Sequence, residues 1–453
     1  MNLYDEQPAE HAPPGVDVIL GLGVTGLSCT RWLAGHGREV QVFDSRERPP
    51  GLRAAELVPG ATIGTGSLDV SLPADAARLI VSPGLSLDLP VVAAARERGL
   101  PVIGDIELFA QAVQRPVLGI TGSNGKSTVT TMLAAMAEEA DCRALAGGNL
   151  GVPALDLLNE PEPELYLLEL SSFQLECTFS LRCDAAAVLN LSADHIDRHG
   201  SLESYAAAKA GIFDGARIRV VNRDDERVRS MVADDAGVVT FGFGEPDAGD
   251  FGLRTNGDGR PWFARGTTRL MPVDELRVPG RHNVANALAA LALGHAVGWP
   301  LAAMLDGLRR YGGLPHRTQR VGERRGVTWI NDSKATNVGA AVAAIEGLSG
   351  TLVLIAGGDG KGADFGPLRS ALTGRARAAV LLGRDREALA ALLDGVCPTF
   401  LVDDMEEAVA VAAGHARAED TVLLAPASAS LDMFASYAAR GEAFTQAIGR
   451  LDA

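Results

Sequence analysis

Cysteine is scarce in this chain of 453 residues, which contains only five. The cysteines stand far apart and none belongs to a CxxC pair; they are Cys29, Cys142, Cys177, Cys183 and Cys397. An odd, scattered set does not suit a disulfide framework, and disulfides persist mainly in oxidising compartments. The cysteine content therefore predicts a protein of the reducing cytoplasm.

Positive charge and long apolar runs are also in short supply. Lysine and arginine number 41 against 57 acidic residues, so no basic excess is available to neutralise a nucleic-acid backbone. The longest apolar tract, 285–305, is interrupted by His295 and Pro300, which indicates a buried helix rather than a membrane span. The first fifteen residues are acidic and contain proline, so we expect neither a signal peptide nor a transit peptide. These features predict a soluble protein without nucleic-acid or membrane partners.

Apolar residues are plentiful, at 47 % of the chain, which is enough for sizeable cores. The length suggests about three domains. Short apolar stretches that end in glycine-rich or polar turns recur along the chain, and many of them are followed by helical spacing, so we expect an α/β fold.

One such turn is the stretch 119–128, GITGSNGKST, which follows a short apolar run typical of a buried strand. From Val129 onwards apolar residues recur at helical spacing, so a helix follows. Glycines let backbone N–H groups approach an anion, the helix N-terminus adds partial positive charge, and Lys126 and Ser127 are placed for phosphate and Mg²⁺. The strict phosphate-loop pattern has glycine where this chain has Ile120. The match is to a variant loop, and an ordinary strand–helix turn is the alternative.

A second glycine-rich turn lies near the beginning of the chain. A short strand, 17–20, runs into GLGVTG at 21–26, a helix follows from about 27 to 34, and the next strand ends at Asp44. Glycines at this spacing, with an acid about 20 residues further on, are the dinucleotide fingerprint. Taken alone the fingerprint suggests an NAD-dependent oxidoreductase, and glycines that serve only a tight turn are the plainer alternative.

The chemistry of this turn is broader than NAD binding. Any diphosphate can rest on it, and Asp44, Ser45 and Arg46 can hydrogen-bond a base or a sugar beyond it. A further strand, 78–81, ends in Ser82-Pro83-Gly84 at the same edge of the predicted sheet, where ligands of open α/β sheets bind. We therefore predict a UDP-type or dinucleotide-type domain that ends near Gly104.

The central part of the chain supplies a carboxylate for metal binding. The strand ELYLLE, 164–169, ends in Glu169 with apolar residues on both sides. A carboxylate at the end of a strand beside a phosphate loop is the expected partner of Mg²⁺. A solvated strand-end acid is the alternative.

Two features of the following segment stay open. After a strand at 184–190, the run DHIDRH holds His195 and His199, which suit a metal or catalytic loop but equally two exposed turn histidines. Lys209 lies among alanines in a predicted helix, YAAAKAGIF, and composition alone is compatible with a surface lysine whose stem packs against the helix.

The rest of the chain reads as further α/β structure. A strand at 219–222 is followed by an irregular stretch, 223–279, that predicts surface hairpins. GRHNVAN then opens a long helix on which Asn283 and Asn286 share a face and could bind a base or ribose. Three more predicted strands alternate with helical stretches and indicate a last small α/β domain; they are 351–356, 379–382 and 421–425.

Nine stretches in a fixed order carry a resemblance to a known family. They are TGSNGKST, LELSSFQLE, DHIDRH, the lysine in AAAKAGIF, GRHNVANA, GLPHR, NDSKATN, GGDGKGADF and PASASLD. Together they closely resemble the Mur ligases, the ATP-dependent amino-acid ligases that build the peptidoglycan stem peptide. The variant phosphate loop fits, because TG[ST]NGK[ST] is the form that this family uses.

The resemblance implies three α/β domains. A Rossmann-like N-terminal domain, 1–104, would hold the UDP substrate. A central P-loop ATPase-type domain, 105–313, would bind ATP, and a Rossmann-like C-terminal domain, 314–453, would bring the amino acid. The implied reaction adds D-glutamate to UDP-N-acetylmuramoyl-L-alanine through an acyl phosphate, with ATP as co-substrate. The alternatives are a sister ligase with another amino acid or L-glutamate, folylpolyglutamate synthase, or a P-loop nucleotide switch that is not a ligase.

The resemblance also implies the site residues. Those for ATP are Gly122, Ser123, Asn124, Gly125, Lys126, Ser127, Thr128, Asn283, Asn286, Arg317, Asp332 and Lys334. Those for the UDP substrate are Gly23, Val24, Thr25, Asp44, Ser45, Arg46, Ser82, Pro83, Gly84, Asn149 and His195. Those for the amino acid are Thr336, Lys361, Ser430, Leu431 and Tyr437, where the family more usually has phenylalanine in place of Tyr437.

Two Mg²⁺ sites and a modified lysine complete these expectations. The first ion would lie between Ser127, Glu169 and the ATP phosphates. In the family the lysine that corresponds to Lys209 is carbamylated, which turns a cation into a carboxylate able to bind a second Mg²⁺ with His195. The implied catalytic set is Lys126, Glu169, His195 and Lys209. The partners expected are small-molecule substrates only, for a cytoplasmic monomer.

Overall fold

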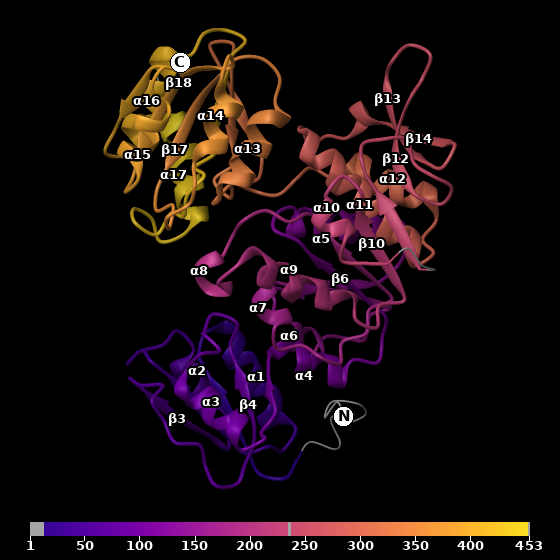
Figure 1. Ribbon diagram of the computed structural model, residues 1–453, viewed down its shortest axis with the longest axis vertical. Helices are drawn as coiled ribbons and strands as arrows, with labels where there is room; N and C mark the ends of the chain where they lie inside the picture. Colours follow the sequence, from indigo (N-terminus) through magenta and orange to yellow (C-terminus); the bar gives the residue numbers. More distant parts are fainter. Residues whose placement is uncertain (1–12, 234–236, 452–453) are drawn as a thin grey trace. The chain divides into compact units, whose positions relative to one another are not determined.

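The computed structural model describes residues 13–233 and 237–451. Its strands form three separate sheets, and each sheet is built from one continuous stretch of the chain (Figure 1). The acidic segment at the beginning, for which the sequence predicts no targeting peptide, lies largely outside the described residues. None of the helices in the described ranges is long and apolar enough to cross a membrane.

The first sheet has the strand order β3-β2-β1-β4-β5, all parallel, which is a Rossmann-type arrangement. Its strands are β1 (Val16–Leu20), β2 (Val40–Asp44), β3 (Ala61–Thr65), β4 (Ala76–Val81) and β5 (Val102–Ile103). Its helices are α1 (Val24–Gly35), α2 (Leu52–Ala55) and α3 (Pro90–Glu97). Alternate side chains of β1 enter two hydrophobic clusters, Ile19 one and Val18 the other, because successive residues of a strand face opposite sides.

The predicted first helix begins three residues earlier than its apolar spacing indicated, at Val24 rather than near Leu27. The reason is that the helix starts directly on the glycine turn, with Gly23 as its N-cap. Gly26 lies in the first turn, where a Cβ would be 1.8 Å from the carbonyl oxygen of Gly21. Only glycine therefore fits, and Val24 and Thr25 are held at the carboxyl edge of the sheet.

The second sheet has nine strands in the order β14-β13-β12-β11-β10-β9-β6-β8-β7. They are β6 (Val117–Thr121), β7 (Ala144–Gly148), β8 (Leu165–Glu169), β9 (Ala185–Val188), β10 (Ile218–Asn222), β11 (Val238–Phe241), β12 (Phe251–Thr255), β13 (Pro261–Arg265) and β14 (Thr268–Pro272). The parallel core places the ends of β6 and β8 side by side, with Ile120 opposite Glu169. This register brings the phosphate loop beside the predicted metal carboxylate.

Helices precede, connect and follow these strands along the chain. They are α4 (Asp105–Ala112), α5 (Lys126–Glu139), α6 (Ala154–Leu157), α7 (Ser172–Leu175), α8 (Ile196–His199), α9 (Leu202–Ala210), α10 (Glu226–Arg229), α11 (Arg281–Ala296) and α12 (Leu301–Arg310). The apolar tract 285–305 is divided between α11 and α12, because Gly298, at a φ of +82°, and Pro300 interrupt it. The tract is thus buried helix, as predicted, in two segments separated near Pro300.

The stretch 223–279 is more regular than the prediction of surface hairpins. The antiparallel pair β12–β13 is such a hairpin. β11, however, pairs in parallel with β10 and extends the central sheet. Its four residues, VVTF, lie beside glycines and aspartates, so the composition of the segment masked a short strand.

The third sheet has the order β15-β16-β20-β17-β18-β19 and is parallel except for the edge strand β15. Its strands are β15 (Gln319–Arg324), β16 (Val327–Asn331), β17 (Leu352–Gly357), β18 (Ala376–Leu382), β19 (Thr399–Leu401) and β20 (Thr421–Leu424). Helices α13 (Val338–Gly347), α14 (Gly366–Leu372) and α15 (Arg386–Leu392) belong to this part, as do α16 (Met405–His415) and α17 (Tyr437–Arg450). Hydrophobic clusters cover both faces of the sheet.

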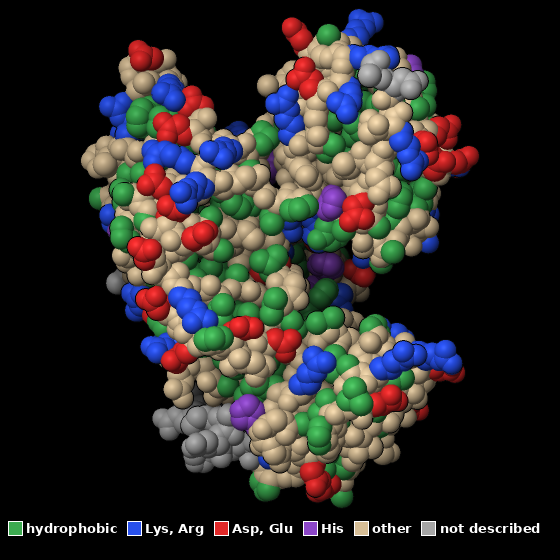
Figure 2. Space-filling model, turned by 180° about the vertical axis from the view of Figure 1, so that it is seen from behind, with side chains coloured by type: hydrophobic (Ala, Val, Ile, Leu, Met, Phe, Trp, Pro, Cys, Tyr) green, Lys and Arg blue, Asp and Glu red, His purple; other side chains and the backbone are tan. Residues whose placement is uncertain are grey.

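By their contacts the described residues fall into two compact units. One comprises the chain up to 191 with 195–270 and 288–308, and so holds the first two sheets. The other comprises 192–194, 271–287 and the chain from 309 onwards. The predicted α/β class is confirmed, whereas the boundaries at 104 and 313 stay predictions. On the face drawn in Figure 2 acidic and basic side chains are interspersed.

Candidate active site

The phosphate loop is the turn between β6 and α5. Gly122 has a φ of +148° and Gly125, the N-cap of α5, has a φ of +86°, which residues with a Cβ rarely adopt. A Cβ on Gly122 would also lie 3.0 Å from the Cβ of Leu189. Asn124 N donates to Asn190 Oδ1 at 2.8 Å and Asn190 Nδ2 donates to Asn124 O at 3.0 Å. The loop is thus rigidly held at a helix N-terminus, where anions are favoured.

The other predicted loop residues lie where the turn passes into the helix. Lys126 Nζ donates to the carbonyl oxygens of Gly122, at 2.8 Å, and Ser123, at 3.0 Å. Ser127 and Thr128 follow in the first turn of α5 and are buried. Residues 122–128 therefore form one continuous turn, and the Lys126 ammonium group is hydrogen-bonded to two of its carbonyl oxygens.

Glu169 connects this loop to a second region. Ser127 Oγ donates to Glu169 Oε2 at 2.5 Å, and Asn149 Nδ2 donates to Glu169 Oε1 at 2.6 Å. The carboxylate is buried, with a relative exposure of 2 %. A hydroxyl and a carboxylate oxygen beside a phosphate loop are the ligand types that Mg²⁺ takes together with substrate phosphates and water. The described residues contain no group of three or more His, Cys, Asp or Glu suited to a metal, so a protein-only cage is absent from this part of the chain.

Lys209 is not a surface lysine. It is 1 % exposed, and its Nζ donates to Gly122 O at 2.9 Å and to Thr121 Oγ1 at 3.3 Å. The same Nζ lies 4.6 Å from the centre of the Tyr205 ring. The alternative of a stem packed on the surface was wrong, because α9 turns this position toward the phosphate loop. Lys126 and Lys209 therefore share the carbonyl oxygen of Gly122.

His195 and His199 have different surroundings. His195, at a φ of +55°, is the N-cap of α8, and its ring lies 6.4 Å from that of Tyr205. The His199 ring stacks on Phe173 at 5.3 Å, and its Nε2 lies 2.9 Å from Ser172 Oγ. Burial, with Arg198 nearby, lowers the pKa of His199 to about 4, so the ring is neutral at neutral pH. His199 is thus a neutral packing residue, but its ring also lies 5.2 Å from that of Tyr205, so both histidines lie beside the ring that Lys209 contacts.

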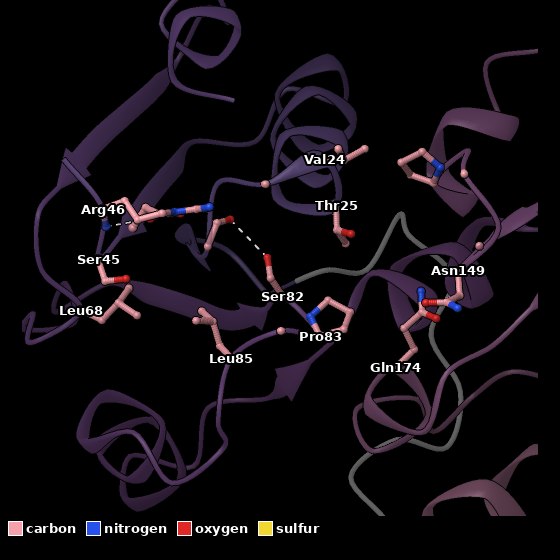
Figure 3. Close-up of a pocket in the computed structure, with 17 residues that line it drawn as sticks. Val24, Thr25, Ser45, Arg46, Leu68, Ser82, Pro83, Leu85, Asn149 and Gln174 are labelled. Atoms are coloured by element: carbon pink, nitrogen blue, oxygen red, sulfur yellow. Dashed lines mark hydrogen bonds and ion pairs between the residues drawn. The ribbon is translucent and has the colours of Figure 1, made fainter. Parts of the chain in front are cut away.

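A cavity of about 470 Å³ lies at the carboxyl edge of the first sheet and reaches the second. In Figure 3 Ser45, Arg46 and Leu68 lie at one end, Asn149 and Gln174 at the other, and Ser82 and Pro83 between them. Ten residues predicted for the UDP substrate line it: Gly23, Val24, Thr25, Asp44, Ser45, Arg46, Ser82, Pro83, Gly84 and Asn149. His195 is not among the lining residues. Asn149 connects this cavity to Glu169 and so to the phosphate loop.

The structure adds lining residues that the sequence did not indicate. They are Gly21, Leu68, Leu85, Gly148, Gly151, Pro153 and Gln174. Two of them had a signal in the sequence: Gly21 opens the GLGVTG turn, and Gln174 lies in the LSSFQLE stretch just after Glu169. The others come from turns whose position depends on how the two sheets pack.

Asp44 is the most strongly bound polar group of the cavity. Its oxygens accept from Leu22 N at 2.7 Å, from Arg46 N at 2.9 Å, and from the Arg46 guanidinium at 2.8 and 2.7 Å. The hydrogen bonds from Arg46 lower the pKa of Asp44 to about 2. The carboxylate is therefore ionised and oriented at neutral pH.

We expect Asp44→Asn to raise the KM for the UDP substrate by about tenfold, the cost of weakening one hydrogen bond to a charged group, with little change in kcat. Steady-state kinetics at saturating ATP and amino acid would measure this. Asp258→Asn, the same change in an exposed turn, serves as control. An unchanged KM would exclude Asp44 from the substrate site.

Gln174 is held in place by a buried acid. Its Nε2 donates to Asp105 Oδ2 at 3.0 Å, and its Oε1 accepts from Ser171 N at 3.1 Å. Asp105 is 2 % exposed, and burial raises its pKa to about 6. Since its unfolded pKa is near 3.9, the folded state binds the extra proton between about pH 4 and pH 6, and stability falls as the pH rises through this range.

Asp105→Asn is therefore expected to stabilise the fold at pH 7, by at most about 3 kcal/mol, and to lose most of this advantage near pH 4. Thermal unfolding of the variant and the parent at both pH values tests this. Asp258→Asn should show no such pH dependence. An Asp105→Asn effect of equal size at both pH values would contradict the buried-carboxyl explanation.

Three of the residues predicted to contact ATP in the second unit, Asn283, Asn286 and Asp332, belong to two hydrogen-bonded groups. Asn286 Nδ2 donates to Asn283 Oδ1 at 3.3 Å, so the two asparagines share a helix face as predicted. His282 Nε2 lies 3.1 Å from Thr318 Oγ1, which donates to Asp332 Oδ2 at 3.2 Å. Burial raises the pKa of Asp332 to about 6, and the neighbouring Arg317 acts in the opposite direction.

The residues predicted for the amino acid come from three loops and the start of α17. Lys334 Nζ lies 4.0 Å from the ring centre of Tyr437. Ser430 is buried, whereas Lys361 and Leu431 are exposed. An isolated bridge between Asp359 and Ala429 joins the loops that carry Lys361 and Ser430. Thr336 follows Lys334 in the loop after β16.

Every lysine of the chain is a predicted site residue. The chain contains four lysines, Lys126, Lys209, Lys334 and Lys361, and every other side chain among its 41 basic residues is arginine. An amine-directed reagent therefore reports on predicted site positions with almost no surface background.

Comparison with known proteins decides the family. Residues 16–104 match the MurD-like N-terminal domain of Mur ligases, 120–294 the Mur ligase middle domain, and 316–428 the Mur ligase glutamate ligase domain. The chain belongs to the Mur ligase family. As a Mur ligase it is an ATP-dependent, amide-bond-forming ligase with three α/β domains.

Curated Mur ligases resemble the chain along its whole length. A UDP-N-acetylmuramoylalanine–D-glutamate ligase of Nitrosococcus oceani is 53 % identical over 445 residues, 98 % of each chain. Proteins of the same name from Pseudomonas syringae pv. tomato and Pseudomonas aeruginosa are 52 % and 50 % identical, over 95 % and 96 % of this chain and 97 % and 98 % of their own.

Solved Mur ligase structures share the fold at much lower identity. UDP-N-acetylmuramate–alanine ligase of Thermotoga maritima superimposes with a TM-score of 0.62, and a pseudomurein peptide ligase type C of Methanothermus fervidus with 0.60. Each is 18 % identical and covers 97 % of this chain and 100 % of its own. At this identity the likeness supports the three-domain fold and nothing finer.

Proposed function

We propose that this Mur ligase joins D-glutamate to UDP-N-acetylmuramoyl-L-alanine, with conversion of ATP to ADP and phosphate, in the synthesis of peptidoglycan precursors. The observation that carries the proposal is the 53 % identity to a D-glutamate ligase over 98 % of both chains. A cavity lined by ten residues that the resemblance assigns to the UDP substrate also supports it.

The first chemical step brings two anions together. A carboxylate oxygen of the substrate attacks the γ-phosphorus of ATP, ADP leaves, and an acyl phosphate forms. Repulsion between the anions is the main obstacle, so catalysis rests on positioning and electrostatic stabilisation. The amides of residues 122–128 and the ammonium of Lys126 are the groups of this chain that offset the negative charge.

The second step forms the amide. The amino group of glutamate attacks the acyl carbon, phosphate leaves from that carbon, and the nitrogen loses a proton. Water would hydrolyse the acyl phosphate, so the site has to be closed to solvent during the reaction. Residues of the second unit would bind the two remaining substrates: Asn283, Asn286, Arg317, Asp332 and Lys334 for ATP, and Thr336, Lys361, Ser430, Leu431 and Tyr437 for glutamate.

Two Mg²⁺ sites belong to the proposal. Ser127 Oγ and Glu169 Oε2 offer the oxygen ligands of the first, next to the phosphate loop. Lys209 as an amine is a donor and a cation, so it fits a second site with His195 only as a carbamate, which carries oxygen ligands. Bound Mg²⁺ would supply positive charge at the transferring phosphoryl group.

Asn149 would orient the substrate. It lines the cavity and donates to Glu169 Oε1, so it connects the predicted UDP site to the catalytic set. Holding the reacting carboxylate near the phosphate loop converts an encounter of two anions into a reaction within one complex. The implied catalytic set remains Lys126, Glu169, His195 and Lys209.

We further propose a monomer that works in the cytoplasm on small molecules alone. Five free cysteines and a net charge of −16 support this setting, since the first needs no oxidising compartment and the second disfavours nucleic acid. Sister ligases, folylpolyglutamate synthase and a nucleotide switch are less well supported. The reason is that the relatives at 50–53 % identity are named as D-glutamate ligases.

Phosphate release tests the function directly. The enzyme would be given ATP, Mg²⁺, UDP-N-acetylmuramoyl-L-alanine and a panel of D- and L-amino acids. We expect turnover that requires both the UDP substrate and D-glutamate. Turnover with another amino acid would indicate a sister ligase, and turnover without either substrate would indicate a nucleotide switch.

A further inference from the structure

Arg440, in the second turn of α17, is the most completely buried arginine described. Its relative exposure is 1 %, although charged side chains are almost never fully buried without a partner of opposite charge. None of the ion pairs among the described residues involves it. Burial lowers its pKa to about 10, so the side chain is still charged at neutral pH. Asp432 lies near enough to favour the charged form of Arg440, but the two side chains form no ion pair. A cation buried without an ion pair requires a structural explanation.

The Arg440 guanidinium donates hydrogen bonds to three separate loops. Nε donates to Ser333 Oγ at 3.0 Å, and Nη2 donates to Ser333 O at 2.9 Å and to Ser428 O at 3.1 Å. Nη1 donates to Ala429 O at 3.3 Å and to Gly357 O at 3.4 Å. These acceptors follow or end β16, β20 and β17. The planar fork of an arginine can reach all of them at once, and no other side chain can.

The same loops are also joined to one another around Arg440. Asp359 N donates to Ala429 O at 3.1 Å and Ala429 N donates to Asp359 O at 2.9 Å. Ser333 Oγ donates to Tyr437 O at 2.8 Å, which ties α17 to the loop after β16. A Cβ on Gly358 would lie 2.1 Å from Ala429 O and 3.3 Å from Arg440 Nη1. The backbone of these loops and the Arg440 side chain are therefore closely packed.

Each joined segment carries one residue of the proposed glutamate site. Thr336 lies three residues beyond Ser333, Lys361 two beyond Asp359, and Ser430 directly after Ala429. Tyr437 begins the helix on which Arg440 lies. Arg440 donates to none of these four side chains; it bonds the backbone beside three of them.

We propose that Arg440 is a positioning residue for glutamate: its guanidinium holds three loops and α17 in the one arrangement in which Thr336, Lys361, Ser430 and Tyr437 converge. This proposal rests on the proposed function. It assigns to Arg440 an effect on glutamate binding that is separate from the UDP-substrate cavity in the other unit.

Arg440→Lys tests the proposal because lysine keeps the charge and loses the fork. We expect the KM for D-glutamate to rise by about tenfold, as befits losing a hydrogen bond to a charged group, while the KM for the UDP substrate changes by less than about twofold. Arg450→Lys is the matched control, since Arg450 lies on the same helix and makes an exposed ion pair with Glu406 at 3.0 Å. It should leave all kinetic constants unchanged.

Ser333→Ala gives a second, milder test should Arg440→Lys fail to fold. It removes the hydroxyl that accepts from Arg440 and donates to Tyr437 O, and we expect the glutamate KM to rise several-fold. A folded variant of either kind with an unchanged glutamate KM, or with equal increases in the KM of every substrate, overturns the proposal. If the wild-type protein shows no D-glutamate-dependent phosphate release, the proposed function is overturned, and the proposal for Arg440 falls with it.

Discussion

Lys209→Ala is expected to lower kcat on the order of 10²–10³-fold or more while the protein stays folded. The loss follows if Lys209, as a carbamate, supplies charged ligand oxygens beside the phosphate loop. The fold should survive because Gly122 O keeps its hydrogen bond from Lys126 Nζ at 2.8 Å, and Thr121 Oγ1 keeps its own bond to Leu170 O at 2.7 Å. Phosphate release and thermal unfolding would be measured on the same preparation.

Chemical rescue distinguishes a carbamate from an amine at this position. The alanine variant leaves space for a small molecule, so acetate should restore part of the activity if the missing group is a carboxylate. Ethylamine should do so if the missing group is an ammonium. Glu203→Ala, on the exposed side of the same helix, is the control and should retain full activity. Near-normal activity of Lys209→Ala would remove Lys209 from the mechanism.

Because the chain has only four lysines, the modification itself can be sought directly. Mass spectrometry of gently handled protein should find carbamylation at Lys209 and not at Lys126, Lys334 or Lys361. Of these, Lys209 alone is proposed as a metal ligand. Modification spread evenly over all four would indicate a non-specific reaction.

Glu169→Gln is expected to lower kcat by about 10²–10³-fold and to shift the Mg²⁺ dependence to higher concentration. The carboxylate accepts from Ser127 Oγ and Asn149 Nδ2 at the same time. Glutamine has one acceptor oxygen, so it leaves one of these donors facing an NH₂ group and removes a negative charge from the proposed metal site. Both the metal and the substrate side of the site should therefore be disturbed.

The two effects can be separated without relying on turnover. Stabilisation by Mg²⁺ with ATP, measured by thermal unfolding, should be reduced in Glu169→Gln. Asn149→Ala removes only the contact on the substrate side, so it should raise the KM for the UDP substrate and leave the Mg²⁺ response intact. Glu164→Gln, an exposed acid just before the same strand, is the matched control. An unaltered Mg²⁺ response in Glu169→Gln would exclude Glu169 as a metal ligand.

The sequence by itself determined the α/β class, the strand–turn–helix at the phosphate loop and the order of motifs that identifies the family. These are local properties. Gly122 and Gly125 need positive φ, apolar runs of four to six residues form buried strands, and the helical spacing after Val129 defines one face of α5. Nine residues of the UDP-substrate prediction lie around one cavity because the ends of parallel strands meet at one edge of the first sheet. The tenth, Asn149, follows β7 of the second sheet.

Only the tertiary structure decided which side chains are buried and what they contact. Spacing could not separate His195 from His199, or a surface lysine from the buried Lys209, because these depend on packing between segments far apart in the chain. Gln174 and Asp105 meet across 69 residues, and Arg440 meets Ser333 across 107. Such contacts are set by how sheets and helices pack, and this packing leaves no period or motif in the local sequence.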